Sequence, residues 1–156
     1  MQSKTKTFLF FTAIPLLVGI VAGLLTRGSM ETFSRLNQPP LSPPGILFPI
    51  VWTILYTLMG IASYLVYSSG KGKEEINNAL LIYFLQLAVN FFWSIFFFNL
   101  EWYTFAFFWL VLLWVLIFYT IRLFYPISNT AAYLLIPYLL WVTFAGYLNF
   151  AIWLLN

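Results

Sequence analysis

Five long stretches of the sequence contain no Asp, Glu, Lys or Arg. They run over residues 7–26, 36–70, 76–100, 102–121 and 123–156. Each stretch reaches the ~20 residues that an α-helix needs to cross a bilayer, whereas strands of a membrane barrel would show ~10-residue segments of alternating polarity. Because lipid offers no partner to backbone polar groups, uninterrupted apolar runs of this length favour helices. The pattern predicts an all-α integral membrane protein: a bundle of five transmembrane helices forming a single domain over residues 1–156.

The composition supports lipid as the main solvent and excludes several kinds of chemistry. Hydrophobic residues make up 63% of the chain and charged residues 7%, against roughly 45–50% and roughly 25% in ordinary globular proteins. The sequence contains no Cys and no His, which excludes disulfides, thiolate or imidazole metal sites and Ser-His catalysis. We therefore expect no metal and no cofactor. No ionisable carboxylate or amine falls in the middle of a span, which argues against a proton-driven transporter. The net charge of +3 is too thinly spread to indicate nucleic-acid binding.

Prolines and charges set the ends of the expected spans. Proline lacks a backbone donor and disfavours the α conformation in the residue before it, so the run Pro39, Pro40, Pro43 and Pro44 keeps the second helix from starting before residue 45. The pair Tyr125-Pro126 separates the last two helices. We expect a long first loop over residues 26–44 and spans at about 7–25, 45–67, 78–98, 102–121 and 130–155.

The basic residues predict how the chain sits in the membrane. The amino terminus and the loops on its side carry Lys4, Lys6, Lys71, Lys73 and Arg122, whereas the other side carries Arg27 and Arg35. Because Lys and Arg accumulate on the cytoplasmic side, the amino terminus is expected in the cytoplasm and the carboxyl terminus outside. A cleaved signal peptide is the alternative for the first span, but its apolar stretch exceeds the ~7–15 residues of a signal core and no Ala-x-Ala site follows it.

Polar and aromatic side chains share helix faces within three of the spans. Their spacing of three or four residues places them on one side of each helix. One hypothesis is that they anchor the protein at the interface and pack helices together, the commoner role of Trp, Asn and Gln in membranes. The other is that they line a pocket for a flat aromatic ligand. The stripes are Trp52, Tyr56, Gly60 and Ser63; Gln86, Asn90 and Trp93; and Tyr138, Trp141, Ala145 and Asn149.

The first span contains Gly19 and Gly23, four residues apart. Small residues at this spacing let two helices approach closely. The motif is equally consistent with packing inside one chain and with a dimer face.

Several segments in the second, third and fifth spans form a recognisable set. They are Leu36-Asn37-Gln38-Pro39, Ser42-Pro43-Pro44-Gly45 and the run from Pro49 to Val66; Gln86-Leu87-Ala88-Val89-Asn90-Phe91-Phe92-Trp93; and Leu135-Ile136-Pro137-Tyr138-Leu139-Leu140-Trp141 with Phe144-Ala145 and Leu148-Asn149. In this order they resemble the translocator protein family (TspO/MBR), also called tryptophan-rich sensory proteins or peripheral benzodiazepine receptors. The chain looks like a bacterial form, so we expect it in the bacterial cell membrane.

The resemblance implies a homodimeric five-helix bundle with a ligand pocket beneath the first loop, which acts as a lid over residues 26–44. Family members bind porphyrins such as protoporphyrin IX and haem, sterols in the mitochondrial forms, and synthetic benzodiazepine ligands. The implied function is a membrane receptor or carrier for porphyrins and related flat hydrophobic ligands. The implied ligand-binding positions are Phe33, Pro43, Pro44, Trp52, Tyr56, Gln86, Asn90, Trp93, Tyr138, Trp141 and Ala145.

Two alternatives stay open at this point. Trp52 and Trp141 match the tryptophans that some family members use in light- and oxygen-dependent porphyrin breakdown, which makes them candidate catalytic residues. Because an indole has no acid-base chemistry at neutral pH, such a reaction would run by photo-oxidation, and we expect a binding protein rather than an enzyme. The second alternative is a structural or assembly subunit without a ligand.

The chain departs from the family pattern at both ends of the expected pocket. Thr32-Phe33 stands where family members often carry Trp-Tyr, and Pro39-Pro40-Leu41 stands where they usually read Pro-Ser-Trp. Any porphyrin contact made by that loop Trp is missing here. At the carboxyl end, Phe150 replaces the Tyr of the animal sterol motif and no Arg follows it, so we do not expect sterol binding.

Overall fold

The computed structural model describes residues 2–156. Within this range, five helical stretches are long and apolar enough to cross a membrane, and no strand occurs. This confirms the predicted all-α bundle of five transmembrane helices. The helical segments are α1 (Gln2–Thr26), η1 (Arg27–Ser29), α2 (Met30–Ser34), α3 (Leu47–Tyr67), α4 (Lys73–Ser94), η2 (Ile95–Asn99), α5 (Tyr103–Phe124), α6 (Asn129–Leu134) and α7 (Ile136–Leu155).

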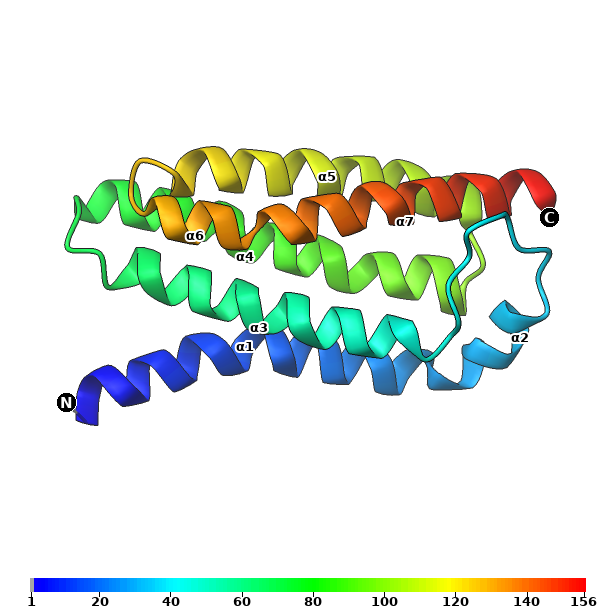
Figure 1. Ribbon diagram of the computed structural model, residues 1–156, viewed down its shortest axis with the longest axis horizontal. Helices are drawn as coiled ribbons and strands as arrows, with labels where there is room; N and C mark the ends of the chain where they lie inside the picture. The colour runs from blue at the N-terminus through cyan, green and yellow to red at the C-terminus, as the bar shows by residue number, and fades with distance from the viewer. Residues whose placement is uncertain (1) are drawn as a thin grey trace.

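The long helices lie side by side along the long axis of the molecule (Figure 1). The start of α1, the turn between α3 and α4 and the turn between α5 and α6 lie at one end, which we call the amino-terminal end. The segment joining α2 to α3, the turn between η2 and α5 and the end of α7 lie at the opposite, carboxyl-terminal end (Figure 1). α1 packs mainly on α3, while α5 packs on α4 and on α7. The three helices that carry the stripes are therefore part of one bundle.

The helices begin and end at positions that local chemistry explains. α4 starts at Lys73, five residues before the expected span, because Glu74 and Glu75 in its first turn stabilise the positive end of the helix dipole. Gly70, at φ +77°, supplies the left-handed residue of the turn that precedes it. The fifth span is interrupted at Leu135, between α6 and α7, because Pro137 has no N–H to continue the helical ladder.

The expected first loop over residues 26–44 is partly helical. η1 and α2 occupy residues 27–34, and irregular backbone runs from Arg35 to Ile46 before α3 begins. The prolines of this segment explain why no helix forms there. We call residues 27–46 the lid segment.

Two glycines set the approach of α1 to α3. A Cβ added to Gly60 would lie 2.5 Å from the Thr12 Cα, and one added to Gly19 would lie 2.5 Å from the Tyr56 ring. A Cβ at Gly23 would meet nothing within 4 Å. Gly19 therefore serves packing inside the chain, whereas Gly23 faces open space.

Candidate ligand-binding site

A chain of hydrogen bonds crosses the middle of the bundle and joins α3, α4 and α7. The Tyr56 hydroxyl donates to the Asn90 Oδ1 at 2.8 Å, and the Asn90 Nδ2 donates to the Tyr138 hydroxyl at 2.7 Å. The Tyr138 hydroxyl in turn donates to the Gln86 Oε1 at 2.7 Å. All four side chains are buried. Since buried polar groups are costly unless they are paired, this network fixes how the three helices meet.

Trp52 lies directly against this network. Its ring stacks on the Tyr56 ring with centroids 5.4 Å apart, and it meets the Tyr138 ring edge-on at 6.2 Å. Trp52 itself is only half-buried. The network therefore holds the two tyrosine rings that determine the pose of Trp52.

Trp141, on α7, forms one wall of an open groove between α3 and α7. The groove has a volume of about 420 Å³, within the range of roughly 300–1,000 Å³ that is usual for small-molecule sites. The Trp141 ring also packs against two phenylalanine rings, with centroid separations of 6.0 Å to Phe48 and 5.4 Å to Phe144. The residues that line the groove are Val51, Ile54, Leu55, Pro137, Leu140, Trp141 and Phe144.

The indole N–H groups divide the tryptophans into two kinds. Trp93 donates to the Asn149 Oδ1 at 3.0 Å, Trp109 to the Val89 carbonyl at 2.8 Å, and Trp114 to the Thr143 hydroxyl at 2.9 Å. The other four, Trp52, Trp102, Trp141 and Trp153, make no indole hydrogen bond to any residue in the described range 2–156. Trp102 is exposed, and Trp153 packs on Phe107 and Phe150. Trp52 and Trp141 are half-buried beside the polar network and the groove, so each presents an aromatic face and a free donor at the site.

Phe33 connects the lid segment to the aromatic residues beside the groove. The centroid of its ring lies 5.8 Å from that of Phe97, 5.3 Å from that of Phe98 and 6.1 Å from that of Phe48. Phe48 in turn contacts Trp141, as described above. A continuous row of rings thus runs from the lid segment to the groove.

Hydrogen bonds fasten the lid segment to the carboxyl-terminal end of α7. The Asn37 N–H donates to the Asn156 Oδ1 at 3.1 Å, and the Asn156 Nδ2 donates back to the Asn37 carbonyl at 3.1 Å. The Tyr147 hydroxyl donates to the Pro40 carbonyl at 2.6 Å. On the other side, the Ser29 hydroxyl donates to the Asn99 Oδ1 at 2.7 Å. These hydrogen bonds tie the lid segment to α7 and η2 at the carboxyl-terminal end of the bundle.

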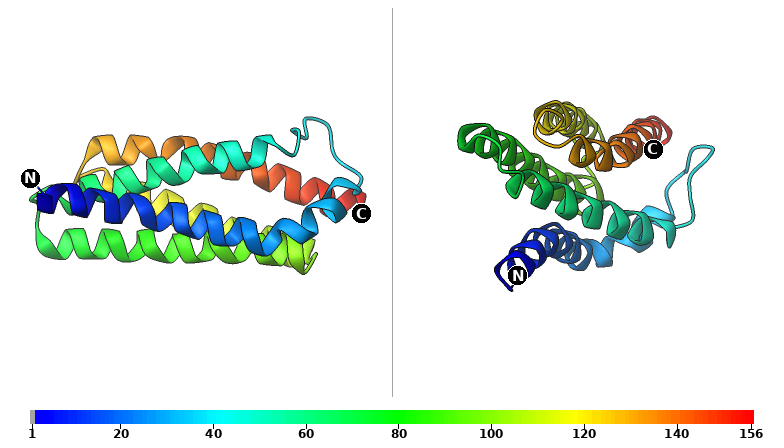
Figure 2. Two further views of the ribbon diagram at one scale, coloured as in Figure 1. Left: turned by 90° about the horizontal axis from the view of Figure 1, so that it is seen from below. Right: turned by 60° about the vertical axis from the view of Figure 1, so that its left-hand side comes forward.

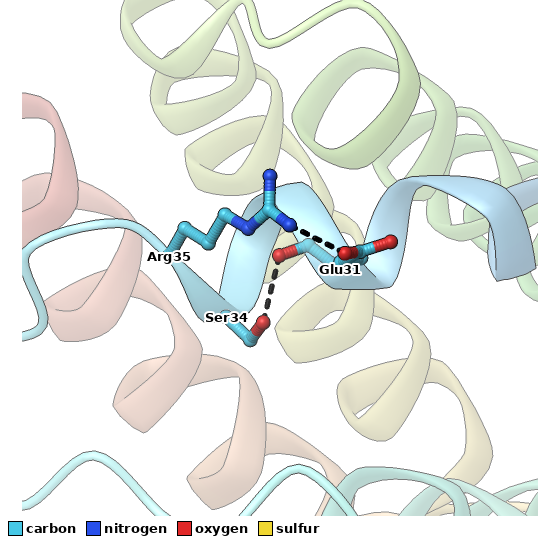
Figure 3. Close-up of polar contacts among 3 residues, drawn as sticks. All are labelled: Glu31, Ser34 and Arg35. Atoms are coloured by element: carbon cyan, nitrogen blue, oxygen red, sulfur yellow. Dashed lines mark hydrogen bonds and ion pairs between the residues drawn. The ribbon is translucent and has the colours of Figure 1, made fainter.

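The charges of the lid segment lie away from the groove. Arg35 forms an ion pair with Glu31, and the Ser34 hydroxyl donates to the Glu31 carbonyl at 2.7 Å (Figure 3). The side chains of the ion pair are 76% and 75% exposed, so the pair contributes only about 0–1 kcal/mol to stability. Within residues 2–156, no three His, Cys, Asp or Glu side chains gather as metal ligands. The site offers aromatic faces and neutral donors.

The structure brings most of the sequence-predicted positions into one region. Trp52, Tyr56, Gln86, Asn90 and Tyr138 form a connected unit, although the last four are buried and bonded to one another rather than open to a ligand. Trp141 and Ala145 lie one turn apart on α7, with Ala145 buried.

The remaining predicted positions lie further out. Trp93 is buried and bonded to Asn149, which is eleven residues beyond Tyr138 on α7. In the lid segment, Pro43 is half-buried and Pro44 is exposed. Ligand contact at these positions stays a prediction.

Sequence reasoning missed two aromatic residues of the site. Phe48 joins Phe33 to Trp141, and Phe144 lines the groove. Trp141, Phe144 and Tyr147 follow one another at intervals of three residues, a spacing that already indicates a shared face. No comparable periodicity marks Phe48, which lies in the first turn of α3.

Fold and site together define a multi-pass membrane protein with an open aromatic groove between α3 and α7 and a lid segment fastened to α7. The sequence profile of the TspO/MBR family matches residues 11–154, and the chain belongs to this family. It is 37% identical to the tryptophan-rich protein TspO of Chlorobaculum tepidum, over 100% of this chain and 99% of the relative. It is also 37% identical to the TspO of Archaeoglobus fulgidus, over 90% and 91% of the two chains. It is 34% identical to the translocator protein of Bos taurus, over 92% and 86%.

Proposed function

We propose that this protein binds porphyrins, protoporphyrin IX or haem-type tetrapyrroles, between the lid segment, α3 and α7. The observation that carries the proposal is the position of Trp52 and Trp141, which are both half-buried and keep a free indole N–H. Trp52 lies against Tyr56 and Tyr138, and Trp141 lines the groove, whereas within residues 2–156 no such surface adjoins Trp153. Flat conjugated ligands gain stacking energy on such rings, and their polar substituents accept hydrogen bonds from the donors. The resemblance stated above independently implies the same ligand class.

The lid segment adjoins the open groove through Phe33 and Phe48, so its release would extend the site for a ligand larger than the groove. The groove beside Trp141 holds about 420 Å³, and the row of rings from Phe33 to Phe48 extends the aromatic surface beneath the lid segment. A macrocycle would enter when the hydrogen bonds of Asn37 and Pro40 to α7 and its end break. It would then lie against Trp52 and Trp141. The structure thus supports a receptor or carrier in which binding and lid closure are linked.

Fluorescence quenching tests this proposal. Protoporphyrin IX is titrated into the protein in lipid nanodiscs, and Trp52→Phe and Trp141→Phe are each expected to raise Kd about tenfold, since each removes a donor and part of a stacking surface worth about 1.4 kcal/mol. Trp153→Phe is the matched control, because Trp153 is also half-buried but packs on Phe107 and Phe150 away from the groove. A Kd that is unchanged in both site variants removes the site assignment.

Two further arms separate the alternative functions. Under light and in the presence of oxygen, porphyrin breakdown at the site requires the porphyrin absorbance to decay faster with the wild-type protein than with the Trp52→Phe/Trp141→Phe double variant. Equal decay leaves binding as the function. A correctly folded protein with no affinity for any porphyrin would instead favour a structural or assembly subunit.

A further inference from the structure

The part of the lid segment from residue 37 to residue 46 lies at the carboxyl-terminal end of the bundle, beside the last turns of α7. Figure 2 shows this segment, in cyan, projecting sideways from the helices. A loop that merely joined two spans through water would be expected to project along the bundle axis. The sideways position therefore raises the question of what surrounds this segment.

The length of the fifth span indicates how deep this segment lies in the membrane. The fifth span, Asn129–Leu155, has 27 residues, a length of about 40 Å, which exceeds the ~30 Å hydrocarbon core by about 10 Å. Pro40 is held by the Tyr147 hydroxyl, and Tyr147 lies eight residues, about 12 Å, before the end of the span. Even if the whole excess length were at the carboxyl-terminal end, the Tyr147 Cα would lie at the edge of the hydrocarbon. Helical side chains lean toward the amino terminus, which takes the Tyr147 hydroxyl deeper still.

The backbone of this segment indicates how far it can enter the membrane. Residues 36–70 contain no charged side chain, and Pro39, Pro40, Pro43 and Pro44 have no N–H to satisfy. The Ser42 N–H donates to the Pro39 carbonyl at 3.3 Å, and the Pro40 carbonyl accepts from Tyr147. The N–H groups of Leu41 and Gly45 make no hydrogen bond to any residue in the range 2–156. This backbone therefore belongs at the level of the hydrated headgroups, from which only side chains reach the acyl chains.

The apolar side chains of this segment point away from the protein, and a polar one points into it. Leu41 is 81% exposed and Ile46 is 73% exposed, whereas the Ser42 hydroxyl is turned inward and buried. Leu41 also has φ 72°, a left-handed conformation that costs energy in a residue with a Cβ. Its side chain gains little from the protein at such exposure, so an apolar surrounding would offset that cost.

We propose that residues 40–46 lie in the interfacial layer of the bilayer, with the Leu41 and Ile46 side chains among the lipid acyl chains next to the headgroups. The occupant of this apolar surface is the lipid itself. The mouth of the candidate site then faces the boundary between lipid and water, and an apolar ligand reaches it from the membrane. This inference does not depend on which ligand binds.

Because the sequence contains no Cys, a single introduced cysteine gives a unique labelling site. Leu41→Cys is labelled with bimane in phosphatidylcholine vesicles and quenched either by lipid brominated near the headgroup or by aqueous iodide. Lys71→Cys, in the exposed turn before α4, is the water control. Val115→Cys, exposed in the middle of α5, is the lipid control.

The label at residue 41 is expected to be quenched several-fold more by the brominated lipid than the label at residue 71, and several-fold less by iodide. Iodide quenching equal to that at residue 71, with no effect of the brominated lipid, would overturn the proposal. Ile46→Cys carries the same expectation and replaces Leu41→Cys if that variant does not fold. Porphyrin binding does not enter the measurement, so its result is separate from the proposed function.

Discussion

At the scale of single residues, Asn90 is the link between the two tyrosines of the polar network. Its carbonyl oxygen accepts from Tyr56 and its amide nitrogen donates to Tyr138, so it links two tyrosines on two other helices. No other type of side chain with its length provides a donor and an acceptor on the same planar group. Asn90 thereby determines where the Tyr56 ring lies and, through stacking, where Trp52 lies.

Replacing Asn90 by Ala should therefore destabilise the bundle. The variant leaves the buried Tyr56 hydroxyl without its acceptor and removes one of the two partners of the Tyr138 hydroxyl, and we expect the free energy of unfolding to fall by about 1–3 kcal/mol. Denaturant titration in mixed micelles measures this. Asn77→Ala, at an exposed position on the same helix, is the control and should change stability by less than about 0.5 kcal/mol. Equal stability of the two variants would contradict the structural role of the network.

At the scale of elements, the α1–α3 pair depends on the absence of side chains at two positions. Gly60 lets the backbone of α1 approach at Thr12, and Gly19 accommodates the Tyr56 ring. Such close approach maximises van der Waals contact, which drives helix association where lipid removes the hydrophobic effect. Because the Tyr56 ring is also part of the site, the position of α1 is coupled to the site.

Gly60→Ala is expected to push α1 away from α3. The added Cβ would lie 2.5 Å from a backbone atom of Thr12, so the helices must shift, at a cost of about 1–3 kcal/mol. Gly23→Ala is the matched control on α1, because nothing lies within 4 Å of its added Cβ. The measurement is the thermal unfolding midpoint in nanodiscs. A midpoint for Gly60→Ala at or above that of Gly23→Ala would show that the close approach of Gly60 to Thr12 does not limit the stability of the bundle.

At the scale of the whole molecule, charge is distributed unequally between the two ends. The amino-terminal end carries five basic residues and two acidic residues, whereas the carboxyl-terminal end carries two of each. The basic residues of the first group are Lys4, Lys6, Lys71, Lys73 and Arg122. Since Lys and Arg favour the cytoplasmic side, the structure retains the asymmetry on which the predicted orientation rests.

The orientation is tested with single cysteines in intact cells. Lys71→Cys, at the amino-terminal end, should resist a membrane-impermeant maleimide, whereas Ser34→Cys in α2, at the opposite end, should react. Permeabilised cells, in which both should react, are the control for accessibility. The reverse pattern in intact cells would place the amino terminus outside. Assembly into a homodimer and residence in a bacterial cell membrane also stay predictions.

The five spans and the family could be recognised from the sequence because their signals are local. A charge-free run of about 20 residues is sufficient to specify a membrane helix, whatever its neighbours are. The stripes containing Trp52, Asn90 and Tyr138 were visible for the same reason, since they depend only on the spacing along one helix. Whether a stripe packs or binds could not be read in this way, because that depends on what each side chain meets on another helix.

The sequence by itself determined that this protein is a five-helix membrane bundle of the translocator type, with aromatic and amide side chains concentrated on three helices. Only the tertiary structure decided which of these side chains keep a hydrogen-bonding group free for a ligand. Tyr56, Asn90 and Tyr138 bond to one another and to the Gln86 Oε1, although the buried Gln86 Nε2 has no partner within residues 2–156. Trp93 is bonded to Asn149, whereas Trp52 and Trp141 keep free donors. The physical reason is that hydrogen-bond partners and close contacts arise between residues far apart in the chain, such as Asn37 and Asn156, so their pairing exists only once the helices have packed.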